Sequence, residues 1–357
     1  MTAATPPDSD VIAPRAGEEL DAAAVARVVG GKMPGADGVP QIWQFPGGHA
    51  NLTYLLQYST AAYVLRRGPH GDVAAGAHDM GREYRVLSTL YRQFPLAPRA
   101  FVYCEDKSVI GAAFFVMERR RGEVVRTTIP EAMRHHADAG RRMGLALVDA
   151  MADLHALDAA ACGLGDLGRP EGFVDRQLSG WATRWELSKF DDSPAEMQAI
   201  HARLAGDVPR PSRVSIVHND LKLDNCQFDP ANPDRVTSIF DWDMTTLGDP
   251  LIDLGTLLNY WPDPADPPHA QRFNNAAVAG LGLPPRAALI ARYAERTGAD
   301  LASVRWWEAF ALWKTVVVVQ QLHRRWVRGE SKDPRMATVA DRIPSLIAAA
   351  TAVLEDV

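Results

Sequence analysis

The sequence predicts an α+β protein with two lobes, a small β-rich one followed by a larger helical one. Two patterns predict this class: strand-like segments are concentrated in the first third of the chain, and helical periodicity dominates after Glu118. A chain of 357 residues is also long enough for two lobes with a cleft between them. Hydrophobic residues make up 47% and charged residues 23%, which is usual for a globular protein.

The first lobe is expected to follow a flexible tail. Residues 1–17 are small, polar and proline-containing, which predicts such a tail. Residues 18–117 form the predicted N-terminal lobe, in which apolar segments around a Gly-Gly pair are typical of a β-meander. Helices are expected at 18–29 and 82–91, and strands at 41–45, 53–58, 62–66, 100–104 and 112–117.

The predicted C-terminal lobe, residues 118–357, is mainly helical. Helices are expected at 141–157, 173–188, 194–205, 251–260, 284–297, 304–328 and 336–354. Two apolar strand candidates, 214–217 and 236–240, interrupt this series, and the segment 229–234 between them is rich in Asp, Asn and Pro and predicts a hairpin loop. The two strands would hold the residues that follow them rigidly.

Charge and cysteine content exclude several classes of protein. The net charge of −6 gives no electrostatic reason to expect nucleic acid as a partner. Three cysteines without a C-x-x-C pair argue against a disulfide framework or a zinc site, so a reducing cytoplasm fits best. No signal peptide is visible, and no apolar run approaches the roughly 18–20 residues that cross a bilayer. The sequence does not indicate an oligomeric state.

The most informative motif is the segment 218–225, His-Asn-Asp-Leu-Lys-Leu-Asp-Asn, followed by Asp241 after the next apolar run. Kinase chemistry requires a carboxylate to orient the acceptor hydroxyl, which Asp220 would supply, and oxygen ligands for Mg²⁺, which Asn225 and Asp241 would supply. Lys222 either reaches the γ-phosphate or is a solvated loop lysine. The alternative for the whole motif is a turn, because Asp and Asn bond readily to their own backbone.

Other polar residues near this motif are expected to have structural roles. His218 is expected to pack and form hydrogen bonds beneath the loop, and His155 lies on the apolar stripe of its helix, which is typical of a core histidine. Asp249 and Asp253 are expected to cap the following helix.

The order of several short motifs resembles the aminoglycoside phosphotransferase-like kinase family, within the protein-kinase-like fold. More closely, the chain is similar to the amino-terminal kinase portion of acyl-CoA dehydrogenase family proteins. The resemblance covers roughly residues 20–330 and implies two lobes with the active site between them, and ATP and Mg²⁺ as cofactors. It rests on the segments 45–54, 63–67, 82–84, 115–118, 154–158, 218–225 and 239–243.

The resemblance also implies where the nucleotide binds. Gly47 and Gly48, with Asn51 nearby, match the loop over the ATP phosphates, where glycine lets the backbone approach closely; an ordinary hairpin turn is the alternative. Met117, Glu118 and Arg120 match the hinge whose backbone contacts the adenine. The arginines at 119–121 are either an entrance patch for an anionic substrate or unremarkable surface residues.

The chain departs from the family pattern at Arg66. Kinases place a Lys on this strand, paired with a helix Glu, to hold the α- and β-phosphates. Arg66 keeps the charge but is longer and planar, and Glu83 is its expected partner. The alternative is an exposed arginine at a strand edge and a solvated glutamate. The departure puts catalytic efficiency in question more than nucleotide binding.

The phosphate acceptor is the least determined part of the prediction. We expect a hydroxyl-bearing small molecule, and the closer resemblance implies a hydroxyacyl or acyl-CoA-type compound. An aminoglycoside is disfavoured because the helical lobe has no dense Asp/Glu cluster. Most of the tryptophans in this lobe are expected in the core. Three classes stay open: a small-molecule kinase, a nucleotide-binding pseudokinase or regulatory module, and a metal-dependent phosphohydrolase.

Overall fold

The computed structural model describes residues 6–8, 10–46, 51–68, 79–211, 213–270, 272, 278–331 and 333–355. The chain divides into two compact units. Unit 1 consists of Met1–Arg121, Cys162–Leu164 and Ser238–Thr245, and unit 2 consists of Gly122–Ala161, Gly165–Thr237 and Thr246–Val357. Asp241 therefore packs within unit 1, although it lies far along the chain from the rest of that unit.

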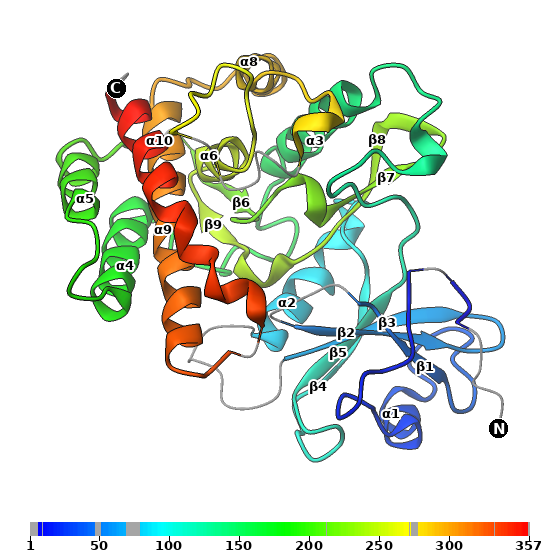
Figure 1. Ribbon diagram of the computed structural model, residues 1–357. Helices are drawn as coiled ribbons and strands as arrows, with labels where there is room; N and C mark the ends of the chain where they lie inside the picture. The colour runs from blue at the N-terminus through cyan, green and yellow to red at the C-terminus, as the bar shows by residue number, and fades with distance from the viewer. Residues whose placement is uncertain are drawn as a thin grey trace. The chain divides into compact units, whose positions relative to one another are not determined.

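Unit 1 contains a five-stranded antiparallel sheet with the order β1-β2-β3-β5-β4. Its strands are β1 (Gln41–Gln44), β2 (Leu52–Gln57), β3 (Ala62–Arg67), β4 (Ala100–Cys104) and β5 (Phe114–Glu118). Its α-helices are α1 (Ala22–Val29) and α2 (Met80–Leu87) (Figure 1). β3 lies at the centre of this sheet, so Arg66 is not on an edge strand.

Alternation along β3 separates an apolar core from a polar face. Leu65 packs in the core that includes α1, together with Val25, Val29 and the inward residues of the neighbouring strands. Successive side chains of a strand point to opposite faces, so Arg66 lies on the other face of the sheet. Burial confirms that both faces are covered: Leu65 is fully buried and Arg66 is 8% exposed.

Two residues of the predicted N-terminal tail, Val11 and Ile12, pack against the sheet. Ile12 pairs with Gln44 of β1 through two backbone hydrogen bonds of 2.8 Å each. Val11 is buried beside Trp43 and Leu55. These two apolar residues therefore add one β-bridge to the edge of the sheet, although the residues around them are mostly small and polar.

Unit 2 is mainly helical, so the predicted α+β class is confirmed. Its α-helices are α3 (Ala139–His155), α4 (Phe173–Ser188), α5 (Glu196–Gly206), α6 (Leu251–Asn259), α8 (Arg286–Thr297), α9 (Val304–Val327) and α10 (Ile343–Glu355). Its strands are β6 (Ser215–Val217), paired with β9 (Thr246–Gly248), and β7 (Cys226–Asp229), paired with β8 (Asn232–Ile239), whose last two residues belong to unit 1. Short 3₁₀ helices include Leu223–Asn225 and Trp242–Met244.

The last helix begins later than expected. The sequence predicts helix over 336–354, but α10 begins at Ile343, after two 3₁₀ turns. Pro344 explains this limit, because proline lacks an N–H donor and is tolerated only in the first turn of an α-helix. Among the helices that the structure describes, none has the combination of length and apolar character needed to span a bilayer.

The core of unit 2 depends on the close packing of α6, α9 and α10, which lie side by side (Figure 1). Trp306, Trp307, Phe310 and Trp313 of α9 form a chain of ring contacts, and all four are buried, as expected for most tryptophans of this lobe. Gly255 of α6 permits the close approach of α9. A Cβ atom there would lie 2.5 Å from the backbone oxygen of Trp307.

This packing predicts opposite effects for two Gly→Ala substitutions in helices. Gly255→Ala places a methyl group against backbone that cannot move cheaply, so the free energy of unfolding should fall by about 2 kcal/mol or more. Gly180→Ala in α4 meets nothing within 4 Å and should raise stability by up to about 1 kcal/mol, because alanine favours helix. Urea unfolding followed by circular dichroism measures both. Equal effects would contradict the packing argument.

Candidate functional site

The Asp220 loop, residues 218–225, follows β6 in unit 2 and is anchored by one buried carboxylate. Asp253 of α6 accepts hydrogen bonds from the backbone N–H of His218, at 2.7 Å, and of Asn219, at 2.6 Å. Asn219 has a φ of +66°, a left-handed conformation that is costly for a residue other than glycine. The carboxylate therefore holds the backbone in a strained shape immediately before Asp220.

Asp253 is itself held by a buried polar network. Nε2 of His155 lies 3.0 Å from Asp253 Oδ2, and His155 Nδ1 lies 2.8 Å from the hydroxyl of Tyr293. Burial would raise the pKa of Asp253, but the hydrogen bond and charge of His155 and the bonds from the loop outweigh it and lower the pKa. His155 is thus a satisfied core residue, as expected.

The expectation that Asp253 caps a helix was wrong. Asp253 lies within α6, and its carboxylate binds the Asp220 loop rather than the end of its own helix. Asp249 does bind the helix start, since its Oδ1 accepts the N–H of Leu251 at 2.9 Å. His218 is fully buried and its Nδ1 lies 3.3 Å from the N–H of Asp220, which agrees with a packing role beneath the loop.

Within the loop, Asp220 is contacted by two side chains. Nδ2 of Asn225 donates to the backbone oxygen of Asp220 at 2.8 Å and to its Oδ2 at 3.1 Å. Nζ of Lys222 lies 3.1 Å from the same Oδ2 and 5.0 Å from the centre of the Tyr260 ring. Burial would lower the pKa of Lys222, but the attraction of Asp220 raises it. Lys222 is therefore not the solvated loop lysine of the alternative prediction.

In unit 1, Arg66, Glu83 and Asp241 form an ionic cluster, the Arg66 cluster. Arg66 Nε lies 3.0 Å from Glu83 Oε2, and Arg66 Nη2 is paired with Asp241 Oδ1. The side chains of Arg66 and Glu83 are 10% and 1% exposed, so the alternative of an exposed arginine and a solvated glutamate is wrong. Burial would lower the pKa of Arg66, but the two carboxylates raise it.

The segment with Asp241 is fixed to the same cluster through its backbone. Oε1 of Glu83 accepts the N–H of Trp242 at 3.3 Å, and Trp242 Nε1 donates to the oxygen of Ile239 at 2.8 Å. The indole of Trp242 also packs edge-on against Phe94. Asp241 has a φ of +68°, so this predicted metal ligand has a left-handed backbone conformation. Asn219, next to the predicted base Asp220, has the same conformation.

The predicted nucleotide contacts are placed only in part. Met117 is buried on β5, and the N–H of Glu118 donates to the backbone oxygen of Arg99 at 2.8 Å. The guanidinium of Arg120 donates to the backbone oxygens of Pro95 and Ala97. Asn51 is 5% exposed at the start of β2, whereas Gly47 and Gly48 lie outside the described residues.

The arginines after the hinge are engaged by acidic residues of the N-terminal segment. Arg119 pairs with Asp8 at 2.5 Å and with Asp10 at 3.1 Å, and Arg121 pairs with Asp8 at 3.0 Å. These pairs favour a structural role for Arg119 and Arg121 over an entrance patch for an anionic substrate.

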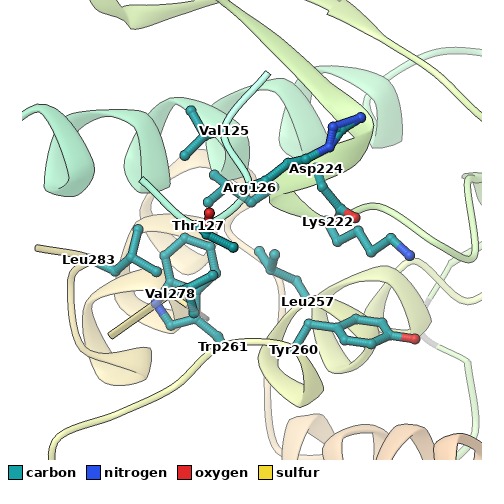
Figure 2. Close-up of a pocket in the computed structure, with 11 residues that line it drawn as sticks. Val125, Arg126, Thr127, Lys222, Asp224, Leu257, Tyr260, Trp261, Val278 and Leu283 are labelled. Carbon is teal, nitrogen blue, oxygen red and sulfur yellow. The ribbon is translucent and has the colours of Figure 1, made fainter. Parts of the chain in front are cut away.

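A cavity of about 190 Å³ lies beside the Asp220 loop in unit 2. Lys222 and Asp224 of the loop and Tyr260 at the end of α6 contribute to its wall, as Figure 2 shows. The other lining residues are Val125, Arg126, Thr127, Leu223, Leu257, Trp261, Val278 and Leu283. Its walls are thus largely apolar, with charged groups on the side of the loop.

Residues 41–307 match the sequence model of the Phosphotransferase enzyme family. The chain belongs to this family. The matched range includes the Arg66 cluster, the Asp220 loop and Asp253. The family resemblance and the kinase-like fold predicted from the sequence are therefore confirmed.

Among curated proteins, this family member is 31% identical to acyl-CoA dehydrogenase family member 11 of Mus musculus, over 85% of this chain and 39% of that protein. It is also 31% identical to the Homo sapiens protein of the same name, over 81% of this chain and 37% of that protein. The chain spans about two fifths of the length of these relatives.

Two solved structures of phosphotransferases have folds similar to that of this chain. A proposed aminoglycoside phosphotransferase from Ralstonia eutropha is 28% identical with a TM-score of 0.77, and the match covers 95% of this chain and 99% of that one. A thermostable variant of aminoglycoside phosphotransferase APH(4)-Ia, in complex with AMP-PNP and hygromycin B, is 18% identical with a TM-score of 0.56, covering 88% of this chain and 93% of that one. The second likeness concerns the fold alone.

The anchoring of the Asp220 loop gives a prediction for a residue that touches no solvent. Asp253→Asn removes the charge that accepts two loop N–H groups and faces His155, so the free energy of unfolding should fall by about 3 kcal/mol. Asp249→Asn, whose amide oxygen can still accept the N–H of Leu251, should cost less than about 1 kcal/mol. Thermal unfolding measures both variants. A smaller loss for Asp253→Asn than for Asp249→Asn would refute the anchoring role.

Proposed function

We propose that this phosphotransferase family member is an ATP- and Mg²⁺-dependent kinase that transfers the γ-phosphate to a hydroxyl group of a small molecule. The observation that carries the proposal is the arrangement around Asp220. Its carboxylate contacts both Asn225 and Lys222, on a loop whose backbone is fixed by a buried carboxylate. Positioned carboxylates of this kind serve as the base of kinase catalytic loops.

The side chains of the Asp220 loop have complementary tasks in this reaction. The Asp220 carboxylate accepts the proton of the acceptor hydroxyl as its oxygen bonds to the γ-phosphorus, and the bond to the β-phosphate oxygen breaks to leave ADP. Asn225 keeps the carboxylate oriented through its Nδ2 donor. Lys222, a cation beside the carboxylate, balances the negative charge of the phosphate that approaches it.

Asn225 and Asp241 suit Mg²⁺ as ligands. Asn225 uses its Nδ2 toward Asp220, so its Oδ1 is the atom that would bind a cation, and Asp241 offers a carboxylate that is about one third exposed. Hard oxygen donors in this small number are typical of Mg²⁺ sites completed by phosphates and water. When bound, the ion would neutralise developing charge on the phosphates. Within the described residues, no group of three or more His, Cys, Asp or Glu could hold a metal.

Arg66 is proposed to hold the α- and β-phosphates in place of the usual lysine. Its Nε is fixed by Glu83, and its Nη2 pairs with Asp241. The second pair also supports the pseudokinase alternative, because it neutralises a carboxylate proposed for Mg²⁺. The kinase function requires that Arg66 exchange this contact for phosphate when Mg·ATP binds.

The acceptor is proposed to be a small hydroxylated metabolite. The names of the curated relatives are in keeping with an acyl-type compound, such as a hydroxyacyl group or its CoA ester. The apolar walls of the cavity beside the Asp220 loop would accommodate such a chain. Hygromycin B is bound by a structural neighbour, and an aminoglycoside is a less suitable acceptor here because two of the three charged residues that line the cavity, Lys222 and Arg126, are cationic, against one carboxylate, Asp224.

Asp220→Ala should abolish turnover while Mg·ATP still binds. A positioned base contributes roughly 10²–10⁴-fold to the rate, and Asp220 is proposed to act on the acceptor, not on the nucleotide. The control is Asp234→Ala, which removes an exposed carboxylate paired with Arg142. ADP release across a panel of hydroxylated metabolites measures turnover, and calorimetry measures Mg·ATP binding. Turnover of Asp220→Ala within threefold of the unmodified protein would exclude the assignment.

Arg66 and Glu83 should act as one unit. Arg66→Ala should lower activity strongly, whereas Arg66→Lys should retain part of it, because Glu83 can pair with either cation. Glu83→Ala should resemble Arg66→Ala, and the double variant should lose far less than the sum. Initial rates and Mg·ATP affinity give the cycle, with the exposed Arg92→Ala as control. Additive losses would contradict the unit, and Mg·ATP binding without transfer to any tested acceptor would favour the pseudokinase.

A further inference from the structure

Two cations in unit 2 flank one indole ring. Trp181 and Arg184 lie one turn apart on α4, and Lys314 lies on α9, which packs along α4 (Figure 1). The Arg184 guanidinium lies 4.4 Å from the centre of the Trp181 ring, and Lys314 Nζ lies 5.3 Å from it. Trp181 is 6% exposed, Lys314 is partly buried and Arg184 is exposed. The ring therefore supports two positive charges next to solvent.

This pair of cations adjoins the Asp220 loop. Lys314 Nζ donates to the backbone oxygen of Asn219 at 3.3 Å, and Asn219 immediately precedes Asp220. Burial lowers the pKa of Lys314, and repulsion from Arg184 and Lys222 lowers it further, against the attraction of Asp220 and Asp253. Lys222 and Lys314 thus both interact with the proposed base, and Arg184 lies beside Lys314 on the same ring.

Lys314 and Arg184 differ from the other cations of the proposed site in their partners. Lys222 is paired with Asp220, and Arg66 is paired with two carboxylates. Among the residues that the structure describes, neither Lys314 nor Arg184 forms an ion pair. A partly buried ammonium held only by a carbonyl and a ring keeps an incompletely compensated charge, which is costly unless another anion completes it.

A purely structural role explains less. If Lys314 only fastened the loop through Asn219, a neutral donor would serve without the repulsion from Lys222 and Arg184. The Arg184 guanidinium stacks on Trp181 and, among the described residues, forms no hydrogen bond or ion pair with the Asp220 loop. Both cations lie against the same ring, but no acidic residue of the described chain pairs with either of them. This arrangement is expected of a subsite that binds an anion.

We infer that Lys314 and Arg184 bind an anionic group, a carboxylate or a phosphate, on the same acceptor molecule whose hydroxyl is phosphorylated at Asp220. The inference rests on the proposed function and narrows its substrate class. Lys314 and Arg184 supply charge and hydrogen-bond donors to the anion, and the Trp181 ring keeps the two cations next to each other. The same cations repel a polycationic acceptor.

The first test measures binding without phosphoryl transfer. Hexanoate and hexyl phosphate carry the two candidate anions, and hexanamide and hexylammonium are neutral and cationic probes of the same length. Ligand-observed NMR titration should give tighter binding of at least one anion than of hexanamide, with hexylammonium weakest. Arg184→Gln and Lys314→Gln, which keep donors but lose the charges, should each weaken anion binding roughly tenfold and leave hexanamide unchanged.

The second test measures transfer, with hexanoates hydroxylated at each position from C2 to C6 and the matching amides as acceptors. In Arg184→Gln, KM for a hydroxyhexanoate should rise roughly tenfold while kcat, KM for its amide and Mg·ATP affinity stay unchanged. Lys314→Gln should raise the same KM. Lys314→Arg, which keeps the positive charge, should have a KM close to that of the unmodified protein. A merely structural role would instead lower kcat for acid and amide alike.

The two tests separate the inference from the proposed function. If the unmodified protein binds anion and amide equally, or if Arg184→Gln leaves anion affinity unchanged, the anion subsite is refuted even where phosphate is transferred. If anions bind through both cations but no tested acceptor leads to ADP release, the anion subsite is supported and the proposed kinase function is refuted. Should Lys314→Gln fail to fold, Arg184→Gln at its exposed position decides the outcome alone.

Discussion

The Asp220 loop depends on the two side chains that hold Asn219. Its N–H donates to the carboxylate of Asp253 on α6, and its backbone oxygen accepts from Lys314 on α9. A residue with a φ of +66° has left the strand geometry of β6, so its backbone groups need partners other than a neighbouring strand. Two packed helices supply them. The position of Asp220 therefore follows from helix packing, which is why Gly255 and the tryptophans of α9 matter to a loop that they do not form.

In unit 1, the buried charge of Arg66 is compensated by ion pairs. Arg66 has two carboxylate partners, Glu83 through Nε and Asp241 through Nη2. A planar guanidinium with several donors can contact both at once, whereas an ammonium is a single point of charge. This gives a physical reason for arginine where the family pattern has lysine. The departure therefore concerns how Asp241 is held within unit 1 as well as how phosphate would be bound.

Much of this arrangement could be predicted from the sequence, because some signals are local. The two-residue period of β3 places Arg66 opposite the apolar core, and a helix with a glutamate at the right distance supplies its partner. The spacing of Asp220 and Asn225 likewise predicts their contact. Asp253 gave no such signal. An aspartate in the first turn of a helix ordinarily stabilises that helix, and only the tertiary structure reveals that this carboxylate binds the backbone of His218 and Asn219 instead. The contacts of Val11 and Ile12 with the sheet were also not predicted. A prediction from the composition of residues 1–17 averages over the segment and gives no weight to these two apolar residues.

Charge illustrates the same distinction between composition and position. The chain carries a net charge of −6, yet Lys222 and Lys314 both interact with Asp220, and Arg184 interacts with Lys314. At physiological ionic strength the screening length is about 8 Å, so a ligand close to Asp220 experiences these cations far more than acidic residues elsewhere. Of the three, only Lys222 has a carboxylate as its ion-pair partner among the described residues. The net charge therefore argues against a nucleic-acid partner without arguing against an anionic small molecule. Nucleic-acid binding depends on charge over a large surface, whereas a small anion depends on the few cations that lie close to it.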